Sequence, residues 1–248
     1  MKVLFATSEA QPFAASGGLA DVSGALPKAL RARFVGCRVI MPLYDSISAE
    51  LRENMTFIGS ISVPVSWRRQ YCGIFEAKSD GVIYYLLDNQ YYFKRGTLYG
   101  HYDDAERFAF FSRAVLEVLP VIDFKPDIIH CNDWQTALVP VYKDLFYAER
   151  PEYSGIKTIF TIHNIQYQGI YSMEILGDVF GIYLAARVYK SALSFSCASR
   201  SFSFWLWINC PGFLLKPSKV STCSFHFSQL STGEKPVSRH FTRLCFAS

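Results

Sequence analysis

The fold is decided by residues 2–33, which read KVLFATSEAQPFAASGGLADVSGALPKALRAR. Residues 2–7 (KVLFAT) form a short, continuous apolar run, which is typical of a β-strand buried on both faces. After a loop that contains Gly17 and Gly18, apolar residues recur at positions 19, 22, 26 and 30, and this spacing predicts a helix over residues 19–33. A buried strand followed by an amphipathic helix indicates an α/β fold.

The same alternation continues to about residue 182. Further strands are predicted from the apolar runs 37–41, 82–87, 127–131 and 157–162, and further helices over residues 103–119 and 134–148. Residues 55–78 alternate between apolar and polar positions, which indicates antiparallel hairpins at a sheet edge. The predicted fold class is therefore α/β, with a doubly wound, mostly parallel sheet of the Rossmann-like kind.

Composition excludes several classes of protein. Half of the 248 residues are apolar and 19% are charged, so the chain is neither disordered nor fibrous overall. No apolar run approaches the length of about 18 residues that a membrane-spanning helix requires, and the first residues are too short an apolar stretch for a secretory signal. Seven cysteines without a Cys-x-x-Cys pair then indicate reduced thiols. We expect a cytoplasmic protein that does not bind a membrane.

Charge divides the chain into two parts. Residues 1–182 carry 17 Lys and Arg against 20 Asp and Glu, whereas residues 183–248 carry 8 against 1. The second part also holds 13 Ser, 8 Phe and 4 Cys, and no alternation of strands and helices can be placed in it. We predict one domain over residues 1–182, followed by a basic, poorly folded tail over residues 183–248 that a shift of the reading frame would explain. The nucleotide sequence tests this hypothesis.

One motif in the tail suggests nucleic-acid binding. Residues 232–236 (TGEKP) match the linker between C₂H₂ zinc fingers. A finger, however, needs two closely spaced cysteines followed about twelve residues later by two closely spaced histidines. Cys210, Cys223, His226 and His240 do not have this spacing, so no nucleic-acid partner is expected.

Polar residues follow three of the predicted parallel strands, where ligands bind in sheets of this kind. Gly17 and Gly18 precede a helix, where free amides and the helix dipole favour an anion such as a diphosphate, although a plain turn is the alternative. Asp133 follows a second strand and could equally be an N-cap. His163 and Asn164 follow a third strand and have no evident packing role. Their convergence on one sheet edge predicts a site.

These residues stand in motifs that resemble those of bacterial-type glycogen and starch synthases over residues 1–182. The motifs are SEAQPFAASGGLADVSGALPKAL, VIMPLY, LDNQYYFKRGTLYG, DDAERFAFFSRA, PDIIHCNDWQTALVP and TIHNIQYQGIY. The resemblance implies the first half of a two-domain GT-B transferase. Such enzymes transfer glucose from ADP-glucose to the non-reducing end of an α-1,4-glucan with retention, so the implied partners are ADP-glucose and the glucan. No cofactor and no metal is expected.

The resemblance also implies roles for individual residues. His163 and Asp21 are the implied catalytic residues, and the implied substrate-binding residues are Ala15, Ser16, Gly17, Gly18, Asp133 and Asn164. Ala15 and Ser16 stand where many relatives have Lys-Thr, so donor binding at this loop is expected to rest on backbone amides and the helix dipole.

In the resembling family, a second domain holds the nucleotide and a basic pair that grips the diphosphate. Residues 183–248 are too few to form it, so the chain is expected to be inactive alone, because positioning supplies on the order of 7–11 kcal/mol of a barrier. One alternative is a non-catalytic α-glucan-binding module whose sugar-stacking candidates are Tyr91, Tyr92, Tyr99, Tyr102 and Trp134. Another is a different sugar-nucleotide transferase of the same architecture. The oligomeric state stays open.

Overall fold

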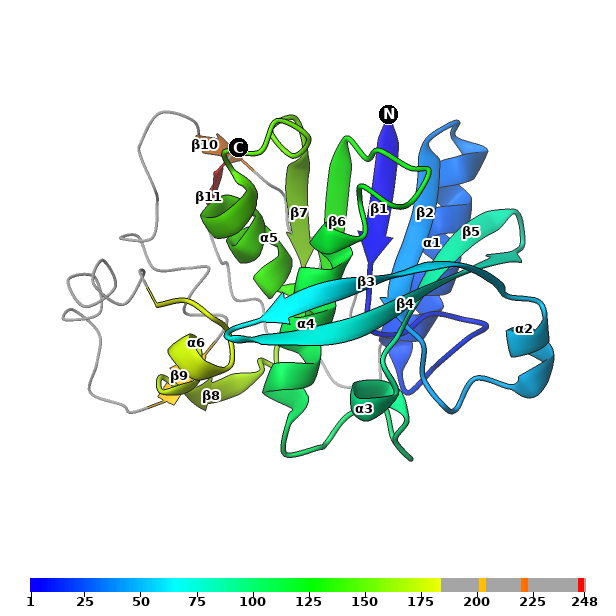
Figure 1. Ribbon diagram of the computed structural model, residues 1–248. Coiled ribbons are helices and arrows are strands. Elements are labelled where there is room, and N and C mark those ends of the chain that lie inside the picture. Colours follow the sequence, from blue (N-terminus) through cyan, green and yellow to red (C-terminus); the bar gives the residue numbers. More distant parts are fainter. Residues whose placement is uncertain (184–200, 204–219, 223–244, 248) are drawn as a thin grey trace, which may run out of the picture.

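A computed structural model describes residues 1–183, 201–203, 220–222 and 245–247. Its centre is a seven-stranded sheet with the strand order β3-β4-β5-β2-β1-β6-β7 (Figure 1). The parallel strands are β1 (Lys2–Ala6), β2 (Gly36–Pro42), β5 (Val82–Asp88), β6 (Ile128–Asn132) and β7 (Lys157–Thr161). The long strands β3 (Thr56–Val65) and β4 (Arg68–Ser79) add to the edge in antiparallel fashion. The predicted mostly parallel α/β sheet and its antiparallel edge are confirmed.

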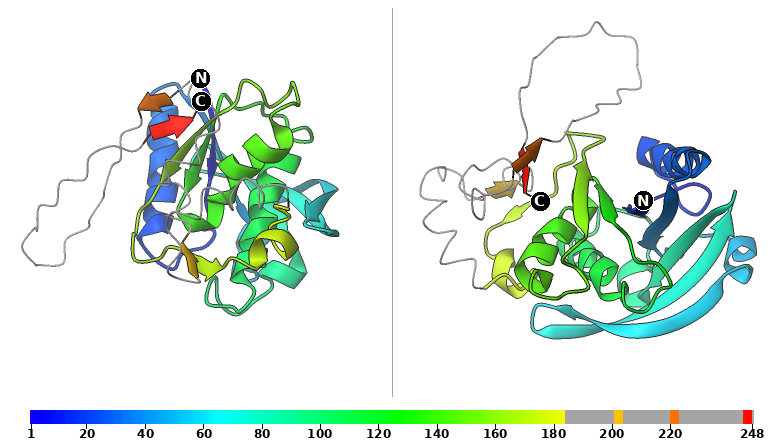
Figure 2. Two further views of the ribbon diagram at one scale, coloured as in Figure 1. Left: turned by 90° about the vertical axis from the view of Figure 1, so that its left-hand side faces the viewer. Right: turned by 90° about the horizontal axis from the view of Figure 1, so that it is seen from above.

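Helices cover both faces of this sheet. Helix α1 (Gly18–Ala32) lies on one face, and α4 (Asp104–Glu117) and α5 (Leu138–Tyr142) lie on the other, as the view from above in Figure 2 shows. Shorter elements are α2 (Ala49–Glu53), α3 (Gln90–Phe93), α6 (Ile175–Asp178), and strands β8 (Ile170–Ser172), β9 (Ser201–Ser203), β10 (Val220–Thr222) and β11 (Cys245–Ala247). Strand β8 pairs with β9, and β10 with β11.

The core lies between the sheet and these helices. Leu4 and Phe5 on β1 are fully buried, as are Ile129 on β6 and Phe110 and Phe111 on α4. Both faces of the central strands are covered, which explains why their sequences are continuous apolar runs. Among the described residues, no helix has the length and apolar character needed to pass through a lipid bilayer.

The helix predicted over residues 134–148 is broken into three pieces. A 3₁₀ turn, η1 (Trp134–Thr136), precedes α5, and a π-helical turn, η2 (Lys143–Tyr147), follows it. Pro140 explains the first break, because it has no N–H to donate to the carbonyl of Thr136 and its ring clashes with that carbonyl. The prediction of a single continuous helix is therefore wrong.

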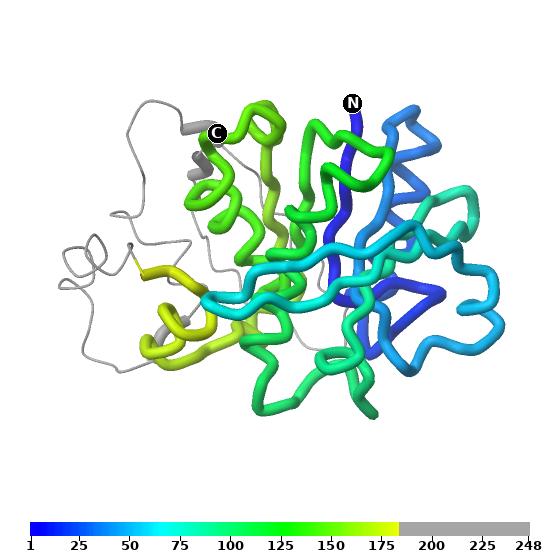
Figure 3. Tube along the Cα trace, viewed as in Figure 1, coloured from blue at the N-terminus to red at the C-terminus, as the bar shows by residue number. Residues whose placement is uncertain are grey.

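The β3–β4 hairpin crosses α4 and reaches the last described segment of the domain (Figure 3). At its tip, Trp67 Nε1 donates to Asp178 Oδ1 at 2.9 Å, and the Ser66 hydroxyl donates to the carbonyl of Gly177 at 2.8 Å. These bonds join residues more than 100 positions apart. The predicted boundary at residue 182 stays a prediction, and most of the predicted tail lies outside the described residues.

Candidate functional site

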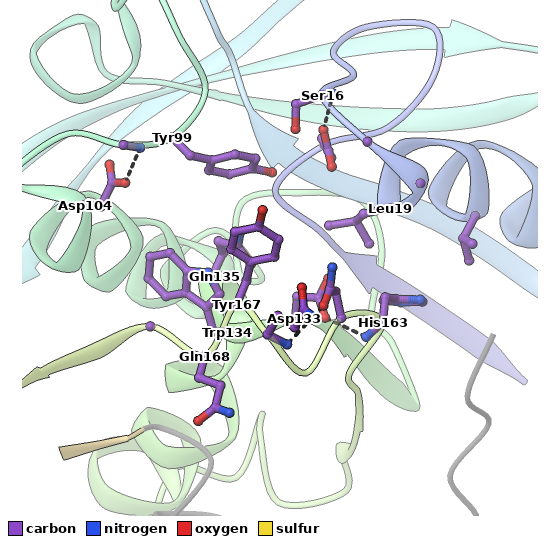
Figure 4. A pocket seen from close by; sticks show the side chains of 18 of the residues that line it. Ser16, Leu19, Tyr99, Asp104, Asp133, Trp134, Gln135, His163, Tyr167 and Gln168 are labelled. Atoms are coloured by element: carbon purple, nitrogen blue, oxygen red, sulfur yellow. Dashed lines mark hydrogen bonds between the residues drawn. The ribbon is translucent and has the colours of Figure 1, made fainter. Parts of the chain in front are cut away.

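A cavity of about 880 Å³ opens at the carboxyl ends of β1, β6 and β7 (Figure 4). It is lined by the loop after β1 with the first turn of α1, by the segment before α4, by η1, and by the loop after β7. Six of the eight predicted site residues line it: Ser16, Gly17, Gly18, Asp133, His163 and Asn164. The rule that ligand sites form at strand ends therefore correctly predicted that residues from three separate parts of the sequence lie together.

The other two predicted residues, Ala15 and Asp21, are not among the residues that line this cavity. Both are exposed to solvent. Asp21 lies in the first turn of α1, between the cavity-lining residues Gly18 and Val22. The roles of Ala15 and Asp21 in substrate binding and catalysis stay predictions.

A buried carboxylate shapes the glycine loop. Glu9 is 3% exposed, and its Oε2 accepts the N–H of Ser16 at 2.5 Å. Burial raises the pKa of Glu9, the Ser16 hydrogen bond lowers it, and nearby Asp133 raises it. Because Glu9 already takes the Ser16 amide, that amide is not available to an incoming anion. Gly17 precedes α1 without a side-chain cap, and no heavy atom lies within 4 Å of a Cβ placed at Gly17 or Gly18.

Asp133 has a strained backbone. Its φ of 56° and ψ of 176° fall in a region that glycine normally occupies. Asp133 is the N-cap residue of η1 by position, as the alternative interpretation expects, but its side chain makes no capping hydrogen bond. Instead, Asp133 Oδ1 accepts the backbone N–H of His163 at 2.6 Å, and the N–H of Asp133 donates to the carbonyl of Thr161 at 2.9 Å. Burial raises the pKa of Asp133, while the His163 amide and ring lower it.

The tautomer of His163 follows from its neighbour Asn132. Asn132 Nδ2 donates to the carbonyls of Ala6 at 3.0 Å and His130 at 3.1 Å, so its Oδ1 is the acceptor that faces His163. His163 Nε2, at 3.0 Å from that oxygen, therefore carries the proton. Burial lowers the pKa of His163, against the opposing charge of Asp133, which favours the neutral ring with Nδ1 as its acceptor nitrogen.

The segment around the start of α4 supplies Tyr99, which was predicted only as a sugar-stacking candidate, and Asp104, which was not predicted as a site residue. Tyr99 lines the cavity, and its hydroxyl lies 2.7 Å from Ser8 Oγ. Asp104 also lines it and accepts the N–H of Gly100 at 2.8 Å. Of the predicted sugar-stacking candidates, Tyr99 and Trp134 line the cavity, Tyr92 is buried in the core, and Tyr91 and Tyr102 are exposed elsewhere. The aromatic content of these motifs was thus a usable signal, but Asp104 and Glu9 had none.

The loop after β7 closes one side of the cavity. Tyr99 and Tyr167 both point into the cavity in Figure 4, and the Tyr167 side chain is 70% exposed. Gly169 has a φ of 60°, and a Cβ there would overlap the ring of Trp134. A glycine is therefore required at position 169 by both its backbone angle and its close approach to the indole. No cluster of three potential metal ligands occurs among the described residues.

Comparisons with known proteins show which family the chain is similar to. The model of the starch synthase catalytic domain family matches residues 2–205. Glycogen synthase of Geobacillus thermodenitrificans is 56% identical over 182 residues, which is 73% of this chain and 38% of the relative. Glycogen synthase of Clostridium perfringens is 55% identical over 181 residues, again covering 73% and 38%.

A solved structure is also similar. The catalytic domain of Starch Synthase IV from Arabidopsis thaliana, bound to ADP and acarbose, matches with a TM-score of 0.73 and 30% identity, over 82% of this chain and 42% of that chain. The chain thus spans about 38% of the length of the curated relatives that it matches. It belongs to the starch synthase catalytic domain family.

Proposed function

We propose that the chain forms one wall of an α-glucan synthase site, which transfers glucose from ADP-glucose to the non-reducing end of an α-1,4-glucan with retention. The observation that carries the proposal is the meeting of polar residues from three strand ends in one cavity. Family membership supports it, and so do the ADP and acarbose bound to the Arabidopsis relative. A cytoplasmic location is part of the same proposal.

The charges of the cavity favour sugar hydroxyls. Its described lining contains the carboxylates Glu9, Asp104 and Asp133 and no Lys or Arg. Asp104 is paired with Arg107, whereas Glu9 and Asp133 have no cationic ion-pair partner among the described residues. Carboxylates accept hydrogen bonds from hydroxyl groups, and they stabilise the positive charge of an oxocarbenium-like transition state.

Individual roles follow from the hydrogen bonds. Because Nε2 is engaged by Asn132, His163 Nδ1 is the acceptor nitrogen of the neutral ring; no described residue bonds to it, so it can accept a hydrogen bond from a hydroxyl of the transferring glucose. Asp133 Oδ1 accepts the backbone N–H of His163, so the positions of these two residues depend on each other. The exposed Tyr167 offers an aromatic face on which a sugar ring can stack. Asp21 is assigned to the donor side by resemblance.

The test uses the purified 248-residue polypeptide with maltoheptaose and ADP-glucose. Calorimetry is expected to detect maltoheptaose binding. An ADP-release assay is expected to show no turnover above background, because the chain covers 38% of the length of the glycogen synthases that it matches. His163→Ala should abolish the binding. His101→Ala is the matched control, since His101 is half-buried, bonds to Thr97 and lies outside the cavity lining.

Two outcomes would contradict the proposal. Turnover by the polypeptide alone would show that it is more than one wall of the site. A folded polypeptide that ignores maltoheptaose would show that the cavity does not serve a glucan.

A further inference from the structure

Arg107 is a fully buried guanidinium beneath the cavity wall. It lies on α4 and is 0% exposed. Its Nε donates to the carbonyl of Tyr92 at 2.6 Å, and its Nη1 donates to the carbonyl of Leu98 at 3.1 Å and to Asp104 Oδ1 at 2.5 Å. The rings of Phe93 and Phe108 lie at 5.6 and 5.4 Å from the guanidinium carbon. A charge this deep in the core needs a specific reason, because burying it is expensive unless it is paired.

Asp104 extends the contact to the cavity. While Oδ1 meets Arg107, Oδ2 accepts the N–H of Gly100 at 2.8 Å. Gly100 has a φ of 88°, so the chain turns sharply at this point. The Arg107–Asp104 pair therefore holds the carbonyl of Leu98 on one side of Tyr99 and the amide of Gly100 on the other.

Tyr99 is the residue that this grip positions. Its ring lies 5.9 Å from that of Phe108, and its hydroxyl meets Ser8 Oγ just past β1. Burial and the charge of Glu9 raise the pKa of Tyr99. Tyr99 thus links the segment before α4 to the end of β1 and forms part of the cavity wall.

We propose that Arg107, acting through Asp104, is a positioning residue that fixes Tyr99 and Gly100 for contact with the sugar; this rests on the proposed function of the cavity. The geometry requires arginine. Its planar fork reaches two carbonyls and a carboxylate at once, whereas a lysine ammonium is a single point on a flexible stem. Arg107→Lys would keep the positive charge but could not make all of the hydrogen bonds to Tyr92, Leu98 and Asp104 at once.

The first test measures amide hydrogen exchange at Gly100 in Arg107→Lys. The matched control is Arg113→Lys on the same helix. Arg113 packs on Phe146 at 4.3 Å and pairs with Glu117 at 3.6 Å, away from the cavity lining. We expect the Gly100 amide to exchange about tenfold faster in Arg107→Lys than in the control. Each variant is measured at the same number of degrees below its own melting temperature. Equal protection of Gly100 in the two variants would overturn the proposal.

The second test is a double-mutant cycle on maltoheptaose binding. We expect Arg107→Lys to weaken binding about tenfold, Arg113→Lys to change it by less than about twofold, and Arg107→Lys to add nothing in a Tyr99→Ala background. Additive losses would show that Arg107 does not act through Tyr99. If the unmodified polypeptide does not bind maltoheptaose, the proposed function fails, and exchange at Gly100 still decides whether Arg107 positions this segment.

Discussion

Among the described residues, four residues other than glycine have a positive φ, and two of them, Phe34 and Asp133, make an informative pair because they lie at opposite ends of the parallel strands. Phe34, with a φ of 62°, precedes β2 at the amino end, and Asp133, with a φ of 56°, follows β6 at the carboxyl end. Phe34 is 98% exposed, and its turn is held by backbone bonds from Phe34 N–H to Arg31 and from Val35 N–H to Leu30. Asp133 is 8% exposed and its side chain bonds to His163.

The difference shows what strain can indicate. At Phe34 the backbone pattern is that of a helix end where glycine is usual, and Phe34 is not among the residues that line the cavity at the strand ends. At Asp133 the strain places a buried carboxylate in a cavity wall. Strain alone therefore does not mark a site, whereas strain that aims a hydrogen-bonded side chain into a cavity does. Substitutions at the cavity, near the carboxyl ends of the strands, should consequently lower the free energy of unfolding. Replacing Phe34 with glycine, at the amino end, should raise it.

The largest effect is expected for Asp104→Asn. This change leaves the buried Arg107 without a compensating charge, so the free energy of unfolding should fall by about 3–5 kcal/mol. Denaturant titration measures it. Asp80→Asn is the control, because Asp80 pairs with Lys28 at an exposed site and should contribute about 0–1 kcal/mol. Equal losses of unfolding free energy in the two variants would contradict the claim that the buried Asp104–Arg107 pair contributes more to stability than an exposed ion pair.

Next comes the pH dependence contributed by His130, which lies on β6 just before Asn132. Burial lowers the pKa of His130 to about 4, and nearby His163 adds to the shift. The unfolded chain takes up a proton near pH 6.5 and the folded chain does not until about pH 4, so stability falls as the pH drops through this range, by about 3 kcal/mol. His130→Gln should flatten the unfolding free energy between pH 7 and 4.5. An unchanged slope would contradict the assignment.

Comparing Asp133→Gly with Asp133→Ala isolates the strain. Both variants lose the bond to His163, but glycine accepts the backbone angles and alanine does not. The glycine variant should be more stable by about 1–3 kcal/mol, and neither should bind maltoheptaose. Thermal unfolding and calorimetry measure the two quantities. If alanine were as stable as glycine, Asp133 would not be strained.

The smallest effect is expected for Phe34→Gly. Removing a side chain from a left-handed helix end should stabilise the protein by about 1 kcal/mol, with Phe34→Ala as the control that keeps the strain. The melting temperature should rise by about 2–4 °C, with glucan binding unaffected. A loss of binding in Phe34→Gly would mean that the amino end of the sheet also serves the ligand.

Much of the fold could be predicted because buried parallel strands have a simple signature. The runs that became β1, β6 and β7 are continuous and apolar, and the alternating stretch became the β3–β4 hairpin. The break at η1 and α5 was missed because the apolar spacing of a helix continues across Pro140, whereas its missing N–H does not show in that spacing.

The candidate site was predictable where it depends on strand ends and not where it depends on partners. His163, Asn164 and Asp133 follow strands, so their meeting could be inferred from topology alone. Glu9 and Arg107 are charged residues that a sequence suggests are exposed, and their burial depends on the Ser16 amide and the Leu98 carbonyl. Only the folded chain brings these partners together.

The contact of Gly169 with Trp134 has a consequence for the width of the cavity mouth. Residues 166–168 rim the opening, and the chain can run this close to the indole because position 169 has no methyl group. A Cβ at position 169 would overlap the Trp134 ring, so alanine there would displace residues 166–168 away from the indole. The width of the cavity mouth therefore depends on the absence of a Cβ atom at position 169.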